Sequence, residues 1–339
     1  MKLLFVTQAL DLDDPTLSVY HGWAEGLAKR ADSLIVICLK QGRHALPANV
    51  QVYSLGKEKG RAPAFVYALR FLSLVWRLRN KYDRVLVHMN QEYLLVAGLV
   101  WKVLHKPTYL WRNHYAGSWV TDVAASFCKK VFCTSKDSYT AKYKKTILMP
   151  VGVDLERFMG PEIEGRMRSS ILFLARMAPS KHPEMLIEAL LILKKKGTSF
   201  TATFAGSPLP EYEYYYSWLQ QRAQREFPDR SIVFTPGVPN AETPHLFHTH
   251  NIFVNCSQSG MFDKTLFEAA ASGCLVLARS EDFEERAGSE YYFTDAESLA
   301  ERMGAMLEDT SQETKRAHMQ SIAKAEGLDT LMDRLIAVI

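Results

Sequence analysis

The sequence predicts an α/β protein with two doubly wound parallel sheets. Three observations support this prediction. Short β-branched runs alternate with helix-length segments, the alternation pauses once near the middle, and 339 residues with 47% hydrophobic content are enough for two cores. Because strands that alternate with helices form parallel βαβ units, we expect one such series in each half of the chain.

The first half of the chain predicts five strands separated by helices. One intervening segment places Tyr20, Trp23, Ala24 and Leu27 at the i, i+3, i+4, i+7 spacing of a buried helical face. The strands are expected at residues 3–6, 34–38, 85–88, 108–111 and 131–134.

Pro and Gly interrupt both periods at residues 149–154 and at Gly160-Pro161. We place the domain boundary there, with a first domain at 1–150 and a second at 151–313. The tail at 314–339 reads as helical, and it either closes the structure or crosses back to the first domain. In the second domain, strands are expected at residues 171–174, 201–204, 232–234, 252–255 and 275–278.

Cysteine placement and charge limit the compartment and the partners. The five cysteines are scattered through apolar runs, which favours reduced, buried thiols. Polar and acidic residues end the opening apolar run at residues 3–6, so we expect a cytoplasmic protein. Residues 1–150 carry 22 Lys and Arg against 10 Asp and Glu, and residues 151–339 carry 19 against 27, giving net charges of +12 and −8. The basic half suits an anionic phospholipid surface or a phosphate-linked acceptor, and no motif indicates nucleic acid.

Two strand-end segments of the second half carry candidate binding residues. Arg176 and Lys181 follow the strand at 171–174, where such a pair of cations can clamp a diphosphate, although a solvated basic loop is the alternative. The loop after the strand at 252–255 runs into a helix. There the backbone amides of Lys264, Thr265 and Leu266 are expected to point at an anion, and the carboxylate of Glu268 can accept hydrogen bonds from ribose hydroxyls.

Five segments follow one another along the chain: residues 150–154 with Phe158, 175–177 with Lys181, 204–206, 234–238 and 266–273. In this order they resemble the successive signatures of the GT-B glycosyltransferases of family four. The resemblance implies two facing Rossmann-like domains with a cleft between them. It also implies retaining, metal-independent transfer of a sugar from a nucleotide-sugar donor of UDP or GDP type, without a cofactor, to a saccharide or lipid-linked acceptor.

The same resemblance assigns residues to parts of the substrates. It places Arg176 and Lys181 on the diphosphate, Glu268 on the ribose and the backbone near Val238 on the base. In the first domain it selects His114, at a strand end, as the residue that touches the transferred sugar. A structural histidine is the alternative there.

Two departures from the family pattern affect these assignments. The Glu usually found eight residues before Glu268 is Gly260, so Asp263 or exposed amides replace its contact with the donor sugar. The loop that reads the donor is then formed by Gly260, Met261, Phe262, Asp263, Lys264, Thr265 and Leu266. In the first loop Asp14-Pro15 stands where many relatives have Gly-Gly, and Asp13 or Asp14 is expected to face an acceptor hydroxyl.

Two other patterns allow a second interpretation. His245, His248 and His250 have metal-ligand spacing, but no Cys or carboxylate nearby completes a site, so we expect no metal. The segment at 61–84 is a basic, aromatic, amphipathic helix that either lies on an anionic membrane or packs its apolar side against the sheet.

Two other functional classes compete with the transferase. A catalytically silent GT-B-like nucleotide-binding or regulatory subunit is favoured by Gly260 and by Asp14-Pro15. A nicotinamide dehydrogenase has the right fold class, but no G-x-G-x-x-G follows the strand at 3–6.

Overall fold

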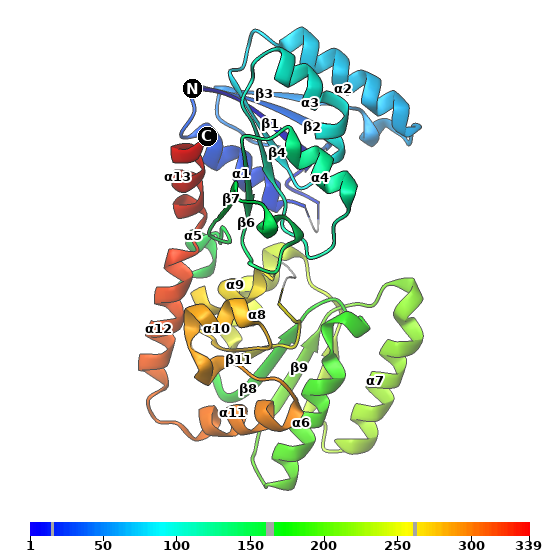
Figure 1. Ribbon diagram of the computed structural model, residues 1–339. Helices are drawn as coiled ribbons and strands as arrows, with labels where there is room; N and C mark the ends of the chain where they lie inside the picture. Colours follow the sequence, from blue (N-terminus) through cyan, green and yellow to red (C-terminus); the bar gives the residue numbers. More distant parts are fainter. Residues whose placement is uncertain (15–16, 161–165, 260–262) are drawn as a thin grey trace. The chain divides into compact units, whose positions relative to one another are not determined.

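A computed structural model describes residues 1–14, 17–160, 166–259 and 263–339 (Figure 1). The described residues divide into two compact units. The first unit contains Met1–Gly152 and Leu328–Ile339, and the second contains Val153–Ser259 and Asp263–Gly327. A parallel sheet of seven strands forms the centre of the first unit and one of five strands the centre of the second. The predicted α/β class with two parallel sheets is therefore confirmed.

The first sheet has the strand order β3-β2-β1-β4-β5-β6-β7. All its neighbouring strands are parallel, and after β3 the chain returns to the other side of β1 to add β4. Its strands are β1 (Lys2–Leu10), β2 (Ser33–Gln41), β3 (Val50–Ser54), β4 (Arg84–His88), β5 (Thr108–Trp111), β6 (Lys130–Cys133) and β7 (Thr146–Leu148). The helices of this unit are α1 (Val19–Ala28), α2 (Ala64–Leu78), α3 (Glu92–Val103), α4 (Trp119–Ser126) and α13 (Leu328–Val338), with short 3-10 turns η1 (Lys57–Lys59) and η2 (Tyr139–Lys142).

Helices cover both faces of the first sheet. Phe5 of β1 pairs in register with Val36 of β2 and Leu86 of β4, and all three side chains are fully buried. Since both faces are covered, the central strands are continuous apolar runs, which made them visible in the sequence. The strands β3 and β7 at the two edges were not predicted, because they are short and largely half-buried.

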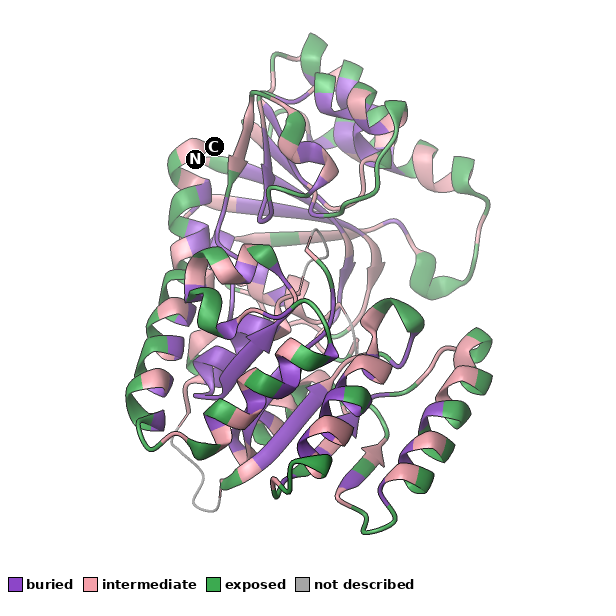
Figure 2. Ribbon diagram, turned by 60° about the horizontal axis from the view of Figure 1, so that its bottom comes forward, coloured by how far each residue is buried: buried purple, intermediate pink, exposed green. Residues whose placement is uncertain are grey.

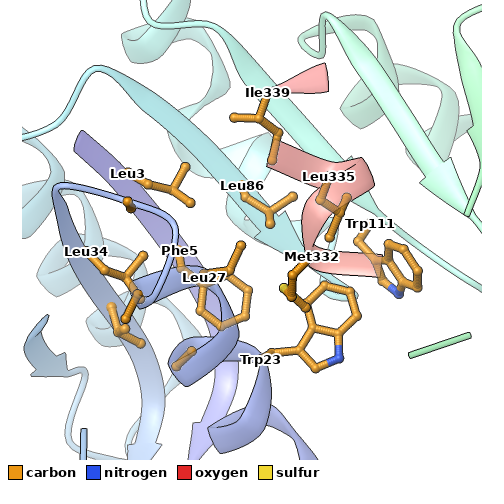
Figure 3. Packing of buried hydrophobic residues seen from close by; sticks show 14 of the residues in the cluster. Leu3, Phe5, Trp23, Leu27, Leu34, Leu86, Trp111, Met332, Leu335 and Ile339 are labelled. Atoms are coloured by element: carbon orange, nitrogen blue, oxygen red, sulfur yellow. The ribbon is translucent and has the colours of Figure 1, made fainter. Parts of the chain in front are cut away.

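The last helix completes the core of the first unit. Helix α13 packs on α1 beside the sheet, where Met332 and Leu335 lie against Trp23 and Leu27 (Figure 3). A Cβ atom on Gly26 would lie 2.8 Å from the Met332 side chain, so glycine permits this close approach of the two helices. The opposite face of the sheet is covered by α2, α3 and α4 around a second apolar cluster.

The second sheet has the strand order β10-β9-β8-β11-β12. Most residues of its central strands are buried, whereas the edge strand β10 buries Ile232 alone, and helices such as α7 expose one side (Figure 2). The strands are β8 (Met167–Leu174), β9 (Thr201–Ala205), β10 (Ile232–Thr235), β11 (His250–Asn255) and β12 (Leu275–Ala278). The helices are α5 (Leu155–Phe158), α6 (Pro183–Lys195), α7 (Glu213–Glu226), α8 (Thr243–Thr249), α9 (Thr265–Ala271), α10 (Glu281–Ala287), α11 (Ala296–Glu308) and α12 (Gln312–Ala325), with 3-10 turns η3 (Pro179–Lys181), η4 (Pro210–Tyr212), η5 (Asn240–Glu242) and η6 (Ser289–Tyr291).

The chain passes between the units at two places. The first passage follows Gly152 and the second follows Gly327, whereas the sequence placed the boundaries at 150 and 313. The expected tail at 314–339 is divided, because most of it, in α12, belongs to the second unit and α13 belongs to the first. All five cysteines are buried and none forms a disulfide, as predicted. Among the residues described, no helix has the length and apolar character needed to cross a bilayer.

Candidate functional site

The carboxyl ends of the second sheet's strands bring the predicted donor residues onto one edge. All neighbouring strands in this sheet are parallel, so the loops that follow β8, β9, β10 and β11 leave from the same side. Ligands bind at this edge in open parallel sheets. The loop after β8 carries Arg176 and Lys181, and the loop after β11 leads to Asp263 and α9.

The structure holds the two predicted cations differently. Arg176 is exposed, whereas the Lys181 side chain is only 20% exposed. The Lys181 Nζ donates a hydrogen bond to Ser257 Oγ at 3.0 Å and lies 3.4 Å from Asp263 Oδ2. A buried ammonium needs such partners, because it has lost most of its hydration. Lys181 is therefore fixed at the strand ends before any ligand binds.

Asp263 is the centre of a hydrogen-bond network that sequence reasoning found only in part. Asn255 Nδ2 donates to Asp263 Oδ2 at 2.6 Å, and Asn255 Oδ1 accepts from the Ser257 amide at 2.8 Å. The hydroxyl of Thr265 donates to the other carboxylate oxygen of Asp263. Asn255 and Ser257 were not predicted as site residues, although their position directly after β11 is a signal that could have found them.

The predicted ribose-binding residue, Glu268, is buried beside a lysine. Glu268 Oε1 lies 3.8 Å from the Nζ of Lys264, and the two side chains are only 11% and 15% exposed. Burial raises the pKa of Glu268 and lowers the pKa of Lys264, and the attraction between the two groups opposes both shifts. The charges of Arg157, Asp263 and Asp154 also act on Glu268, so the contact with ribose stays a prediction.

Backbone approach explains the Phe-Ala-Gly segment at residues 204–206. A Cβ atom on Gly206 would lie 1.8 Å from the carbonyl oxygen of Ala175, so only glycine fits between β9 and the loop after β8. The next residue, Ser207, accepts a hydrogen bond at its Oγ from the amide of Gly237 at 3.0 Å. This bond ties the loops after β9 and β10 together and leaves Val238, the predicted base contact, half-buried beside them.

The short helix α9 leaves little scope for the predicted amide contacts. It has seven residues, and the Leu266 amide donates to the carbonyl of Asp263 at 3.4 Å. The contacts proposed for Lys264 and Thr265 amides stay predictions. Those assigned to Gly260, Met261 and Phe262 lie outside the described residues.

In the first unit, His114 is exposed in the loop after β5. Its Nδ1 accepts a hydrogen bond from the Ala116 amide at 2.9 Å, which is shorter than the 3.3 Å contact with the Ala116 carbonyl. The shorter contact assigns the proton of the neutral ring to Nε2. The ring stacks on Tyr115, with 4.7 Å between the centroids. His114 therefore presents a donor N–H at the carboxyl edge of the first sheet.

The two acidic residues predicted to face an acceptor have cationic partners. Asp13 accepts two hydrogen bonds from the Arg43 guanidinium, at 2.6 Å and 2.9 Å, which lowers its pKa. Asp14 Oδ2 accepts from the Lys40 Nζ at 3.1 Å. An acceptor hydroxyl would have to share these carboxylates, so this contact stays a prediction.

Two members of the histidine triplet, His248 and His250, take part in the second unit's packing, whereas His245 is exposed. His248 is buried in α8, and His250 begins β11, where its ring nitrogens lie 2.8 Å from the Leu246 carbonyl and 2.9 Å from Thr203 Oγ1. Within the part of the chain that the structure describes, no three metal-binding side chains gather into a cluster.

The donor-side residues fall within a known sequence family. A family model described as "Glycosyl transferases group 1" matches residues 168–309. The matched segment, which is less than half of the chain, contains Arg176, Lys181, Asp263 and Glu268.

Curated relatives of the chain are also glycosyltransferases. The chain is 28% identical over 184 residues to the GDP-mannose-dependent alpha-(1-6)-phosphatidylinositol monomannoside mannosyltransferase of Mycolicibacterium smegmatis, which covers 48% of this chain and 47% of the relative. It is 25% identical over 158 residues to the alpha-monoglucosyldiacylglycerol synthase of Streptococcus pneumoniae, covering 43% and 34%. The matched parts span half or less of these relatives.

Solved structures resemble the chain over its whole length. HepE of Anabaena in complex with UDP superposes with a TM-score of 0.79 at 19% identity, covering 100% of this chain and 99% of that one. Sucrose-phosphate synthase from Thermosynechococcus elongatus gives 0.74 at 14% identity, with coverages of 100% and 98%. The fold is that of the GT-B glycosyltransferases.

Proposed function

We propose that this protein is a retaining, metal-independent glycosyltransferase. It moves a sugar from a nucleotide-sugar donor of UDP or GDP type to a saccharide or lipid-linked acceptor. One observation carries the proposal. Lys181 lies at the carboxyl edge of the second sheet, on the same loop as Arg176 and within the segment that matches the group 1 family model, and Ser257 and Asp263 hold its ammonium there.

The donor is held through its charged and polar parts. Lys181 and Arg176 bind the diphosphate and stabilise the negative charge that grows on it as the sugar leaves. Glu268 accepts hydrogen bonds from the ribose, and the backbone at Val238 contacts the base. Asp263, which lies beside Lys181, contacts sugar hydroxyls in place of the Glu that Gly260 replaces.

The chemical step needs little acid–base machinery from the protein. The bond between the anomeric carbon and the diphosphate oxygen breaks, and the acceptor oxygen forms its bond on the same face. The acceptor proton passes to the departing phosphate oxygen. His114 donates its Nε2–H to the transferred sugar, and the cations lower the barrier by stabilising the leaving group.

The first unit binds the acceptor near an anionic membrane. Helix α2 buries Phe71, Val75 and Leu78 against the sheet, so the alternative in which its apolar side packs inward holds for these residues. On its other side Leu69 and Trp76 are exposed, and the Arg79 guanidinium lies 4.5 Å from the Trp76 ring centroid. Such a basic and aromatic surface suits peripheral attachment to the inner face of a membrane. A cytoplasmic enzyme attached to the inner face of the membrane suits the assembly of cell-surface polysaccharide or glycolipid.

A second candidate is a silent nucleotide-binding subunit. It is favoured by the 3.4 Å contact of Asp263 with Lys181, because a carboxylate at that place opposes diphosphate binding. A subunit of this kind would bind a nucleotide and show no release of sugar.

Substitution of both cations tests the proposal. We expect Arg176→Ala combined with Lys181→Ala to lower turnover by more than about 10³-fold, since loss of a single transition-state donor costs about 10²–10³-fold. Lys195→Ala is the matched control, because Lys195 is an exposed cation at the end of the adjacent helix α6. Retained turnover in the double variant would contradict the proposed donor site.

Nucleotide binding separates the candidates. A thermal-shift panel with UDP, GDP, ADP, their sugar conjugates and NAD should give a shift with one sugar nucleotide, since a ligand at 100 times its dissociation constant adds about 2.7 kcal/mol of stability. A shift without any sugar release, with water or an acceptor present, would favour the silent subunit. A shift with NAD alone would favour a dehydrogenase.

A further inference from the structure

The first unit contains an apolar pocket that none of the predicted contacts uses. The pocket has a volume of about 400 Å³ and lies between α2, the start of α3 and the ends of β2 and β3. That size falls within the range of about 300–1,000 Å³ typical of small-molecule sites. Its walls are formed mainly by Leu39, Leu55, Phe65, Phe71, Tyr93 and Val96.

The pocket lies at the carboxyl edge of the first sheet, where we propose that the acceptor binds. Asn90 and Glu92, which line it, follow the carboxyl end of β4. Met89 adopts a left-handed backbone conformation with φ of 67°, which turns the chain sharply between the strand and these residues. Strand β4 neighbours β5, whose following loop carries His114, and neighbouring strands are about 5 Å apart. An occupant of the pocket can therefore extend toward His114.

A basic loop is fastened to the pocket wall. Tyr67, a lining residue, accepts a hydrogen bond from the Ala62 amide at 2.9 Å and donates to the Gly60 carbonyl at 3.1 Å. These bonds hold residues 57–61, with exposed Lys57, Lys59 and Arg61, beside the start of α2. The Arg70 guanidinium donates to the carbonyl of Leu55, another lining residue, at 2.7 Å. The loop beside the pocket thus carries three exposed cations and Glu58, while among the described lining residues Glu92 is the charged one and most of the others are apolar.

The lining chemistry selects the occupant. Among the described lining residues, Asn90 and Glu92 alone add polar side chains to two tyrosine hydroxyls, and those hydroxyls already contact backbone atoms. A sugar or a nucleotide in this pocket would leave most of its hydroxyls unpaired, which is unfavourable. A hydrocarbon chain loses contact with water there without this penalty, and an attached phosphate outside the pocket would meet the cations of the loop at residues 57–61.

We propose that this pocket binds a hydrocarbon chain of a phosphate-bearing amphiphile and that this amphiphile is the acceptor. The inference rests on the proposed function, because it names the class of the acceptor. The chain enters between α2 and α3, the phosphate lies on the loop at residues 57–61, and the group that is glycosylated extends along the strand ends toward His114.

Filling the pocket tests the inference directly. Ala68 lines the pocket, so Ala68→Trp places an indole in the space for the chain. We expect binding of dodecyl phosphate, measured by calorimetry below its micelle concentration, to weaken by roughly tenfold or more. Leu69→Trp is the matched control, because Leu69 is 62% exposed on the same helix and is not a lining residue. Equal binding by the wild type and Ala68→Trp would overturn the proposal.

The head group and the place of binding are tested separately. Replacing Lys57, Lys59 and Arg61 together by Ala should weaken dodecyl phosphate by about fivefold or more and leave dodecyl maltoside binding unchanged. A dodecyl phosphate that carries a photoreactive diazirine on its chain should label peptides from α2 or α3. Labelling elsewhere, or tighter binding of dodecyl trimethylammonium than of dodecyl phosphate, would contradict the assignment. The labelling result needs no substituted protein, so misfolding of a variant cannot obscure it.

Vesicles and donor assays distinguish the possible failures. If Ala68→Trp binds phosphatidylglycerol vesicles like the wild type while dodecyl phosphate binding is lost, the pocket and the membrane surface are separate sites, as we expect. If the wild type binds such vesicles but no monomeric dodecyl phosphate, the pocket inference fails and the surface remains. If the protein hydrolyses a nucleotide sugar but does not bind dodecyl phosphate, this inference fails and the proposed function stands. If it neither binds nor hydrolyses any nucleotide sugar, the proposed function fails.

Discussion

The strand ends of the two sheets are held by different forces. In the first unit, aromatic rings pack around His88 on one face of the sheet and an apolar pocket lies on the opposite face, with cations on the nearby loop at residues 57–61. In the second unit, Lys181, Asp263 and Asn255 hold one another through hydrogen bonds and charge. The basic half of the chain thus has the apolar site, and the acidic half has the buried cation. The net charge of a half does not indicate the character of its site.

The largest expected effect tests the packing of the first unit. Burial among Trp23 and Trp111 lowers the pKa of His88 from 6.5 to about 3. Between these values the unfolded chain binds a proton that the folded chain does not. Stability is therefore full above about pH 6.5 and is lost as pH falls toward 3, by on the order of 4 kcal/mol.

Urea unfolding followed by tryptophan fluorescence measures this loss. We expect His88→Phe to flatten the decline below pH 6.5, because it removes the group that must be protonated. His105→Asn is the control, since His105 is exposed and its φ of 53° suits asparagine. An unchanged pH profile in His88→Phe would mean that His88 does not govern the acid response.

The next effect tests the close backbone approach in the second unit. Gly206→Ala would place a Cβ 1.8 Å from the Ala175 carbonyl oxygen, so we expect a loss of about 3 kcal/mol in the free energy of unfolding. Gly197→Ala meets no atom within 4 Å, and its φ of 78° should cost only about 1 kcal/mol. Calorimetry compares the two, and equal losses would show that backbone strain rather than the contact with Ala175 matters.

A smaller effect tests the chemical part of the first unit. We expect His114→Ala to lower turnover by about 10–100-fold, the value of one hydrogen bond to a charged transition state. Nucleotide binding should stay unchanged, because the donor residues are in the second unit. His105→Asn again serves as the control. Loss of nucleotide binding in His114→Ala would place His114 in a different role.

The smallest effect concerns the charge network of the second unit. Asp263→Asn removes the carboxylate that lies 3.4 Å from Lys181, so a nucleoside diphosphate should bind about fivefold more tightly. Turnover should fall, because the contact with the donor sugar that we propose for Asp263 would be lost. Asp229→Asn, an exposed carboxylate in the same unit, is the control. Weaker diphosphate binding by Asp263→Asn would mean that Asp263 positions Lys181 rather than competing for it.

In the first sheet, sequence patterns predicted the strands that helices cover on both faces and missed the edge strands β3 and β7. In the second sheet, the edge strands β10 and β12 were predicted as well. The runs in β1 and β8 are apolar because helices lie on both sides. In contrast, β3 has exposed or half-buried residues throughout. The candidate site residues were predicted one by one, but the contacts between their side chains were not. Lys181 and Asp263 are 82 positions apart and meet only because β8 lies next to β11 in the sheet. The apolar pocket was missed because its lining residues have the same composition as an ordinary core.

The placement of α13 also fixes an order in time. The core of the first unit contains Leu331, Met332 and Leu335, and the carbonyl of Ile339 accepts a hydrogen bond from the Tyr109 hydroxyl. During synthesis these residues emerge after the whole second unit. Domains usually fold in the order in which they leave the ribosome. Here the unit that is synthesised first receives its last core residues after the other can already be folded, so until then α1 covers this face of its sheet without α13.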